Sequence, residues 1–290
     1  MIRSLLYVPA SSERFIPKAH ERGADAIILD LEDSVAPNEK EKARAGLGEA
    51  VPAVSRHGAA VFVRINSNED MILADAQAAC RAGAFGLFVP KARHPGELKR
   101  VDRLLDEVED AMGRRQKTVL VPMIEDPGAV LDARVLAAAT PRVFGLITGS
   151  EDLATAMDAQ PTPEVLRFPK LMVHMAAKAA GVLSFGLLRS VADFRDIAGI
   201  TRAAQEARAF GFDGATCVHP SAVAILNEAF APSAEEIDRA KRMIRAYEES
   251  LEAGKGACVF EGKMIDVPVV ARARALLAKQ PREQNRSQSV

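Results

Sequence analysis

Short apolar stretches alternate with longer amphipathic stretches along most of the chain. Eight of the short stretches are rich in Val, Ile, Leu and Phe, and their middles contain almost no polar residue. Parallel strands that are covered by helices have this pattern. We expect strands at residues 3–10, 26–33, 61–66, 85–92, 119–126, 143–152, 182–189 and 214–220. A stretch with helical spacing of apolar residues follows each of them, so the pattern predicts eight βα units.

The clearest of the expected helices is 192–211. Ala192 and Asp193 open it, apolar residues recur every three to four positions, and Gly211 closes it. Eight βα units within about 230 residues is the size of a TIM barrel. A doubly wound sheet is the alternative, but residues 8–15 contain no GxGxxG turn after the first strand.

The sequence therefore predicts an α/β fold with two parts. Residues 1–230 form a (β/α)8 TIM barrel, and residues 231–290 form a C-terminal helical extension. Residues 281–290 are polar throughout, and we expect them to be disordered.

Composition excludes several classes of protein. Hydrophobic residues make up 48% of the 290-residue chain, and charged residues 27%, as in globular enzymes. A net charge of −1, no Trp and two Tyr argue against a nucleic-acid surface. The three cysteines are far apart and form no CxxC pair, which indicates a reduced, cytoplasmic setting. We expect no signal peptide and no membrane span.

Polar side chains gather at the carboxyl ends of the predicted strands, where TIM barrels carry their chemistry. The amino ends carry fewer. The acids at the carboxyl ends are Asp30, Glu32, Asp33, Glu125, Asp126, Glu151 and Asp152, and the cations are Arg64 and Lys91. Taken singly, Asp126 or Asp152 could cap the helix that follows it. As a group, seven acids and two cations at one rim favour a functional site.

Several carboxylates at one rim repel each other unless a cation lies among them. Mg²⁺ suits this set because it prefers oxygen ligands and needs one or two carboxylates from the protein. Five scattered histidines form no HxH or HExxH pair, which argues against zinc. Glu125 and Asp152 end adjacent strands and could share one ion, with Arg64 facing its open side. That arrangement suits an α-keto or α-hydroxy carboxylate whose enolate the arginine stabilises.

Three alternatives concern single residues. Arg64 could form a buried salt bridge to Asp30 or Glu32, which is compatible with a catalytic role. Lys91 could form a Schiff base, but neighbouring acids should raise its pKa, so a counter-ion role is favoured. His219, before Pro220, is expected to shape the turn into the next helix.

Seven segments in order resemble the citrate lyase β-subunit-like (CitE-like) family. This group of Mg²⁺-dependent CoA-ester lyases belongs to the HpcH/HpaI aldolase superfamily. The resemblance extends from residue 2 to about 279 and is carried by residues 3–19, 23–44, 61–66, 121–130, 145–154, 211–223 and 262–277.

The resemblance implies roles for individual residues. The metal, Mg²⁺ with Mn²⁺ as the alternative, would be held by Glu125 and Asp152. The substrate would be contacted by Arg64, Glu125 and Asp30, and the CoA phosphates by Lys18. Glu32 and Asp33 would join Arg64 in a catalytic network. Asp266 would act in the active site of a neighbouring subunit, so that the C-terminal extension is a lid within a homotrimer or hexamer.

The implied reaction is reversible carbon–carbon cleavage of a 3-hydroxyacyl-CoA carboxylate of the malyl-CoA or citramalyl-CoA type. Its products are an α-keto acid and an acyl-CoA, and some relatives also hydrolyse the thioester. The chain departs from the family pattern at residues 8–15, 67–72 and 184–194, which belong to loops around the pocket. Two alternatives therefore stay open: a metal-dependent aldolase acting on free hydroxy-keto acids, and the β subunit of a multi-subunit citrate lyase.

Overall fold

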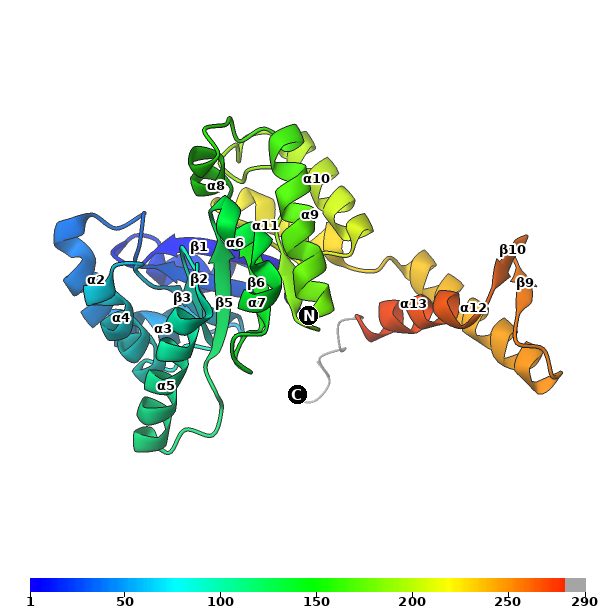
Figure 1. Cartoon of the computed structure of the whole chain (residues 1–290), viewed down its shortest axis with the longest axis horizontal. Helices are drawn as coiled ribbons and strands as arrows, with labels where there is room; N and C mark the ends of the chain where they lie inside the picture. The colour runs from blue at the N-terminus through cyan, green and yellow to red at the C-terminus, as the bar shows by residue number, and fades with distance from the viewer. Residues whose placement is uncertain (280–290) are drawn as a thin grey trace, which may run out of the picture. The chain divides into compact units, whose positions relative to one another are not determined.

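The computed structural model describes residues 1–279. Within them the chain divides into two compact units, Ile2–Phe230 and a second unit that begins at Ala231. The first unit contains a ring of parallel strands surrounded by helices (Figure 1). The strands are β1 (Ser4–Pro9), β2 (Ala26–Asp30), β3 (Ala60–Arg64), β4 (Gly86–Val89), β5 (Val119–Ile124), β6 (Gly145–Thr148), β7 (Leu183–Phe185) and β8 (Ala215–Cys217).

Neighbouring strands pair in the order β7-β6-β5-β4-β3-β2-β1-β8, and each of these pairs is parallel. β7 and β8 meet through one bridge, Phe185 to Gly214, so the barrel is nearly closed. The predicted TIM barrel is confirmed. Seven of its strands lie within an expected stretch, and β3 begins one residue before its stretch, at Ala60.

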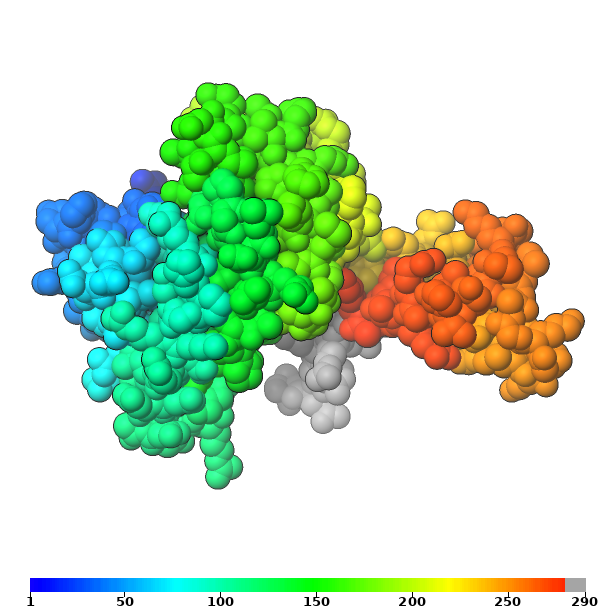
Figure 2. Space-filling model, viewed as in Figure 1, coloured from blue at the N-terminus to red at the C-terminus, as the bar shows by residue number. Residues whose placement is uncertain are grey.

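Helices follow the strands and form the outer layer. They are α1 (Ile16–Ala19), α2 (Lys40–Ala45), α3 (Leu47–Val54), α4 (Glu69–Arg81), α5 (Pro95–Met112), α6 (Pro127–Leu131), α7 (Ala133–Ala137), α8 (Ser150–Ala156), α9 (Pro163–Ala179), α10 (Ile197–Phe210) and α11 (Ser221–Phe230), with 3₁₀ turns at His20–Arg22 and Pro37–Glu39. In the space-filling view, the cyan and green segments of this unit form one continuous surface (Figure 2).

The helix expected to begin at Ala192 and Asp193 begins later, so this boundary was wrong. Asp196 is the N-cap residue of α10, and its carboxylate accepts a hydrogen bond from the Gly199 amide at 2.9 Å. The helix begins after Asp196 because this carboxylate satisfies an amide that would otherwise have no partner within the helix. Residues 186–196 are therefore a loop. Gly211 ends the helix in the left-handed conformation, as predicted.

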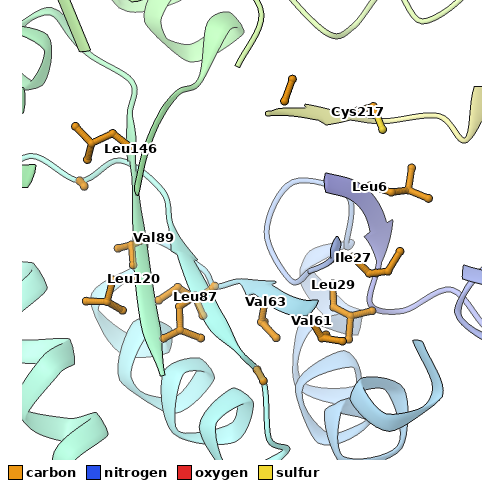
Figure 3. Close-up of a cluster of buried hydrophobic side chains, with 14 of the residues drawn as sticks. Leu6, Ile27, Leu29, Val61, Val63, Leu87, Val89, Leu120, Leu146 and Cys217 are labelled. Atoms are coloured by element: carbon orange, nitrogen blue, oxygen red, sulfur yellow. The ribbon is translucent and has the colours of Figure 1, made fainter. Parts of the chain in front are cut away.

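Alternate residues of the strands face two different cores. One set, which includes Leu6, Ile27 and Leu29, packs against the surrounding helices (Figure 3). The other set fills the barrel interior and consists of Leu5, Ala26, Ile28, Phe62, Phe88, Val121, Met123, Ile147 and Phe185. Because side chains alternate along a strand, this interior row continues to the carboxyl ends of the strands.

The barrel interior is built around aromatic rings. Phe62 makes edge-to-face contacts with Phe85 and Phe88 at centroid separations of 5.2 and 5.3 Å. Gly86 makes room for them, since a Cβ atom there would lie 2.8 Å from the Phe62 ring. The interior below the carboxyl ends is therefore tightly filled and gives the polar residues above it a rigid base.

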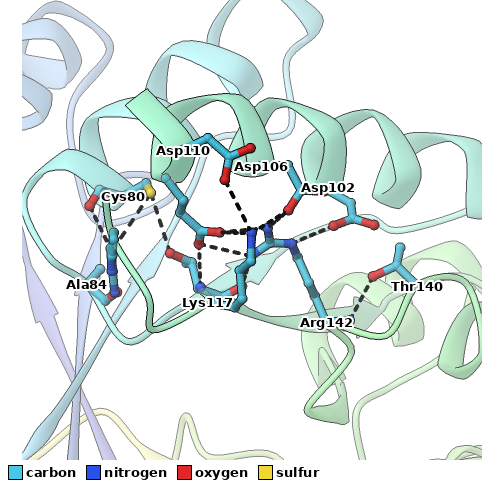
Figure 4. A network of polar contacts seen from close by, with 11 residues as sticks. Cys80, Ala84, Asp102, Asp106, Asp110, Lys117, Thr140 and Arg142 are labelled. Atoms are coloured by element: carbon cyan, nitrogen blue, oxygen red, sulfur yellow. Dashed lines mark hydrogen bonds and ion pairs between the residues drawn. The ribbon is translucent and has the colours of Figure 1, made fainter. Parts of the chain in front are cut away.

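The amino end of the barrel contains a dense charged network that the sequence pattern did not predict (Figure 4). Arg142, just before β6, pairs with Asp102, Asp106 and Glu109 of α5 at 2.5, 2.5 and 2.7 Å. Lys117 also contacts Asp106 and Glu109. These acids come from a helix rather than from strand ends, so the smaller number of polar residues at the amino ends of the strands gave no sign of them.

The C-terminal unit has its own small core. It consists of α12 (Ala234–Glu252), an antiparallel hairpin of β9 (Cys258–Phe260) and β10 (Lys263–Ile265), and α13 (Val267–Ala278). Ser233 and Glu236 form a capping box at the start of α12. The core residues are Ala240, Met243, Tyr247, Ile265, Val270 and Ala273.

The structure does not test two sequence-based predictions for the end of the chain. The role of the extension as a lid stays a prediction, and residues 281–290 lie outside the described residues. Among residues 1–279, no helix is both long and apolar enough to cross a membrane.

Candidate active site

A cavity of about 430 Å³ lies at the carboxyl ends of the barrel strands. Five of the predicted site residues line it, namely Asp30, Asp33, Arg64, Glu125 and Asp152. Glu32 does not line the cavity, but it contacts Arg64 and Lys91 at 3.2 and 3.3 Å.

Strand alternation explains why these side chains converge. Tyr7, Asp30, Arg64 and Glu125 each lie two residues beyond a member of the interior core, and two residues is the repeat of a strand. Asp30 is also in register with Arg64 on the neighbouring strand. The interior row therefore changes from apolar to charged at the mouth of the barrel.

Arg64 is held by acids on one side and by an aromatic ring on the other. Its Nε and Nη2 atoms donate to the two carboxylate oxygens of Asp30 at 2.6 and 2.7 Å. Nη1 donates to Asp33 at 2.9 Å, and the guanidinium carbon lies 5.1 Å from the centre of the Tyr7 ring. The salt-bridge alternative for Arg64 is thus confirmed, and the side chain still faces the cavity.

Asp30 also shapes the loop that carries the other two acids. Its carboxylate accepts hydrogen bonds from the Glu32 amide at 2.9 Å and from the Ser34 amide at 3.1 Å. Burial alone would raise the pKa of Asp30, but hydrogen bonds from Arg64 and Ser34 outweigh it, and the pKa falls below its usual value. Asp30 is therefore a permanent anion that fixes both Arg64 and the loop.

A second network of hydrogen bonds, centred on Lys40, also holds the loop that carries Glu32 and Asp33. The Lys40 ammonium group donates to the carbonyl oxygens of Leu31 and Glu32 at 2.9 and 2.8 Å and to the Asn66 side chain at 2.5 Å. Asn66 in turn donates to buried Asp75. Sequence reasoning missed Lys40 and Asp75, because both lie in helices that give no sign of facing a strand end.

Glu125 is buried, and its side chain occupies space that only a glycine leaves free. One carboxylate oxygen accepts the Lys91 amide at 2.6 Å. A Cβ atom on Gly149 would lie 2.2 Å from the other. Lys91 has a positive φ of 52°, which is uncommon for a non-glycine residue and directs its amide at the carboxylate. Burial raises the pKa of Glu125 to about 7, and the charges of Asp152 and Glu32 add to this.

Asp126 caps a helix in the structure, whereas Asp152 does not. Asp126 is the N-cap residue of α6, where it accepts the Ala129 amide at 3.0 Å, and it pairs with Arg93 at 2.9 Å. The capping alternative for Asp126 is confirmed. Asp152 lies inside α8, whose N-cap residue is Gly149, and its carboxylate lines the cavity. Capping therefore does not account for Asp152.

Lys91 behaves as a counter-ion. Although burial lowers the pKa of its ammonium group, Glu32, Asp152 and Asp33 outweigh burial and raise it. A lysine with a raised pKa is a poor nucleophile, which argues against a Schiff base.

His219 accepts the Ser221 amide at 3.2 Å and stacks on Phe194, in agreement with its predicted role in the turn.

The donor set fits a hard divalent cation. Within residues 1–279, no three or more His, Cys, Asp or Glu side chains form a ready-made metal cluster. Mg²⁺ does not need one, because water and substrate fill most of its coordination sphere. Glu125 and Asp152 lie close enough for the charge of one to raise the pKa of the other. A buried carboxylate in this state needs either a proton or a cation, and its oxygens suit Mg²⁺.

Besides Glu32, two further predicted residues do not line this cavity. Lys18 is exposed on α1 and does not line it. Asp266 belongs to the C-terminal unit, where it is the N-cap residue of α13 and accepts the Val269 amide at 3.4 Å. Their predicted roles stay predictions.

The cavity residues that sequence reasoning missed include Tyr7, Lys170 and Ser190. The two-residue repeat after Leu5 would have identified Tyr7 as an interior residue. Lys170 lies in the middle of a helix, and Ser190 lies in a loop with no motif, so neither gave a signal.

Similarity to known proteins covers nearly the whole chain. A family model described as HpcH/HpaI aldolase/citrate lyase matches residues 3–220. The citrate lyase subunit beta of Haemophilus influenzae is 31% identical over 281 residues, which cover 96% of each chain. A (3S)-malyl-CoA thioesterase of Cereibacter sphaeroides is 34% identical over 280 residues, covering 96% of this chain and 94% of that protein.

Solved structures agree with this result. The crystal structure of CitE from Mycobacterium tuberculosis in complex with magnesium, acetoacetate and coenzyme A matches with a TM-score of 0.76 and 28% identity. The match covers 96% of this chain and 97% of that one, so it includes both units described above.

Proposed function

Because this chain belongs to the HpcH/HpaI aldolase/citrate lyase family, we propose that it is a Mg²⁺-dependent carbon–carbon lyase acting on a CoA ester. The substrate would be a 3-hydroxyacyl-CoA carboxylate of the malyl-CoA or citramalyl-CoA type, and the products an α-keto acid and an acyl-CoA. The CitE structure that contains magnesium and coenzyme A supports both the metal and the thioester. The resemblance identified from the sequence is confirmed at the level of the family.

The observation that carries the proposal is the state of Glu125. A carboxyl group buried beside a second carboxylate, with its pKa raised to about 7, is poorly stabilised as an anion. A divalent cation between Glu125 and Asp152 would remove that cost. Such an ion would polarise the keto oxygen of the substrate.

Arg64 supplies the second part of the chemistry. A guanidinium group has five N–H donors, and Asp30 and Asp33 accept three of them. Glu32 lies 3.2 Å from Nη1, so the second N–H of Nη2 is the donor that remains for a substrate oxygen. Because Asp30 and Tyr7 fix the side chain, Arg64 needs no reorganisation to stabilise the oxygen that becomes negative in an enolate.

In the condensing direction, the α-carbon of the acyl-CoA loses a proton to a base. The electron pair of that C–H bond then forms the new bond to the keto carbon, and the keto oxygen takes up a proton to become the hydroxyl group. In the cleavage direction each of these changes is reversed. Asp266 of a neighbouring copy is our candidate for the base, on the strength of the family resemblance.

The test is a condensation assay. The Mg²⁺-loaded protein is mixed with acetyl-CoA or propionyl-CoA and with glyoxylate or pyruvate, and products are identified by mass spectrometry. We expect a condensed CoA ester that disappears with EDTA and returns with Mg²⁺ or Mn²⁺. Undiminished product after chelation would contradict the metal part, and no product from any pair would contradict the CoA-ester lyase.

Two related activities are tested in the same assay. Similarity to a (3S)-malyl-CoA thioesterase favours hydrolysis of the thioester, which would release free CoA. Similarity to citrate lyase β subunits over 96% of the chain favours a subunit that takes its acyl group from a carrier protein. Turnover of free CoA esters by the isolated chain would exclude dependence on a carrier, while cleavage of free hydroxy-keto acids without CoA would favour the aldolase.

A further inference from the structure

A buried lysine that the proposed mechanism does not use lines the cavity. Lys170 belongs to α9, is 4% exposed, and contributes to the cavity lining. Its ammonium group donates to the carbonyl oxygens of Leu187 and Arg189 at 2.8 and 2.9 Å. Both carbonyls belong to the loop between β7 and α10.

That loop forms one wall of the cavity. Leu187, Ser190, Val191 and Ala192 all line it, and three of these four side chains are apolar. Residues 186–196 contain no helix or strand, so the wall has no backbone ladder to hold its shape. Its position depends on contacts with the helices around it.

Polar contacts hold the loop at several points. At its start, the Gly186 amide donates to the Gly214 carbonyl at 2.9 Å. Further along, Ser190 donates to Glu151 of α8, and Arg189 pairs with Asp196 at the start of α10. Lys170 is the buried side chain that holds the wall-forming part of the loop, and it binds two carbonyls on either side of Leu188 at once. Water competes least with a buried hydrogen bond, so this contact fixes the wall most firmly.

A lysine is an unusual choice for this position. Within residues 1–279, Lys170 forms no ion pair, and Glu151 is the acid whose charge acts on it through space. Burial lowers the pKa of its ammonium group to about 7. Stability alone does not favour a buried, unpaired ammonium group, and such groups concentrate at functional sites.

We propose that Lys170 is a positioning residue that fixes the loop Leu187–Ala192 as the wall contacting the apolar part of the substrate. It sets the affinity for the acyl or keto-acid group without taking part in bond making. The identity of that group rests on the proposed function. The attachment of the loop to Lys170 does not, and it is tested separately.

The first experiment measures the loop without any activity assay. Trypsin cleaves after Arg189 and Arg195, both within the loop, and deuterium exchange reports the amides of residues 186–196. In Lys170→Met, we expect cleavage and exchange of the loop to rise by about tenfold as the clamp is lost. Lys170→Arg should restore most of the protection. Lys178→Met removes an exposed lysine of the same helix and should leave the loop unchanged.

The second experiment is kinetic and is done on the same variants. We expect Lys170→Met to raise KM for the acyl-CoA or keto acid by about fivefold or more, with kcat changed by less than about threefold. Mg²⁺ affinity should stay at the level of the wild type, because the lysine touches no proposed ligand. Lys170→Arg should recover KM.

Each result decides the matter. Unchanged loop protection in Lys170→Met would overturn the clamp, and a looser loop with unchanged KM would overturn its role in affinity. If Lys170→Met does not fold, Lys170→Gln, which keeps two N–H donors without the charge, takes its place in both measurements. Absence of lyase activity in the wild type would contradict the proposed function alone, since the loop measurement stands without it.

Discussion

Two arginines, at opposite ends of the barrel, each meet three carboxylates. Arg142 at the amino end pairs with Asp102, Asp106 and Glu109. Arg64 at the carboxyl end pairs with Asp30, Glu32 and Asp33. Each cluster consists of one arginine, two aspartates and one glutamate, yet the pKa of the glutamate is lowered at the amino end and raised at the carboxyl end.

At the amino end, every acid is well compensated. Burial would raise the pKa of Glu109, but Arg142, the Thr118 amide and Lys117 together lower it to about 2. At the carboxyl end, Arg64 satisfies Asp30 fully, while burial raises the pKa of Glu32 and brings that of Glu125 to about 7. The positive charge near Glu32 and Glu125 is too small to offset the cost of burying their carboxylates.

The difference separates stability from function. A cluster whose charges are all paired can hold a structure together but has no capacity left for a ligand. A cluster with unsatisfied carboxylates beside a cavity stabilises the fold poorly and is ready to bind a cation. TIM barrels divide their two ends in this way, with stability at the amino end and chemistry at the carboxyl end.

The largest expected effect is on the amino-end cluster. Arg142→Met leaves buried Glu109 without its main cation, and we expect a loss of about 3–5 kcal/mol in the free energy of unfolding. The kcat of the folded enzyme should not change, since Arg142 lines no part of the cavity. Denaturant titration followed by circular dichroism measures the first quantity. A stability close to that of the wild type would show that the network is not structural.

The carboxyl-end cluster should respond in the opposite way. Arg64→Ala should lower kcat by about 10²-fold or more, because the enolate loses its preformed donor. Arg93→Ala is the matched control, as Arg93 lies at the same rim but pairs with the capping residue Asp126. Steady-state kinetics on stably folded variants checks both. A loss below about threefold for Arg64→Ala would remove this arginine from the chemistry.

Sequence pattern was sufficient for one of these clusters and not for the other. Asp30, Arg64 and Glu125 follow apolar strand residues directly, so their positions at the mouth of the barrel follow from strand period and order. Arg142 meets acids 33 to 40 residues away on α5, and nothing local in that helix marks the side that faces the strand end. Contacts between a helix and a strand end depend on packing, which periodicity does not specify.

The same limit explains the loop after β7. The sequence pattern placed the start of the helix at Ala192 and Asp193, and the structure instead has Asp196 as the N-cap residue, to which Arg189 also pairs. Lys170 could not be recognised, because a lysine in an amphipathic helix normally faces solvent. Buried polar residues that act on a distant loop are the part of this site that sequence does not reveal.

The pH dependence of stability sharpens the contrast further. The folded pKa of Glu125, about 7, lies above the usual value of 4.5. A raised carboxyl pKa contributes stability below about pH 4.5 that is lost as pH rises through 7. The metal-free protein should therefore lose about 1–3 kcal/mol between pH 5 and 8, and Mg²⁺ should restore it at pH 8.

Glu125→Gln is the variant that isolates this effect, because it keeps the shape of the side chain and removes its charge. Its metal-free stability should vary less with pH than that of the wild type, and Mg²⁺ should no longer raise it. Thermal unfolding with and without EDTA at each pH provides the measurement. A wild-type profile that rises from pH 5 to 8 would contradict the assigned state of Glu125.

The smallest effect distinguishes two aspartates that look alike in sequence. Asp126→Ala removes an N-cap and should cost about 1 kcal/mol of stability, with Mg²⁺ affinity unchanged. Asp152→Ala removes no cap and relieves repulsion with Glu125, so the metal-free protein should be as stable as the wild type or slightly more so. Its Mg²⁺ affinity should fall, which isothermal titration can measure. If both variants lost stability equally and kept their metal affinity, Asp152 would be structural, and Glu125 would be the one remaining carboxylate proposed to hold the ion.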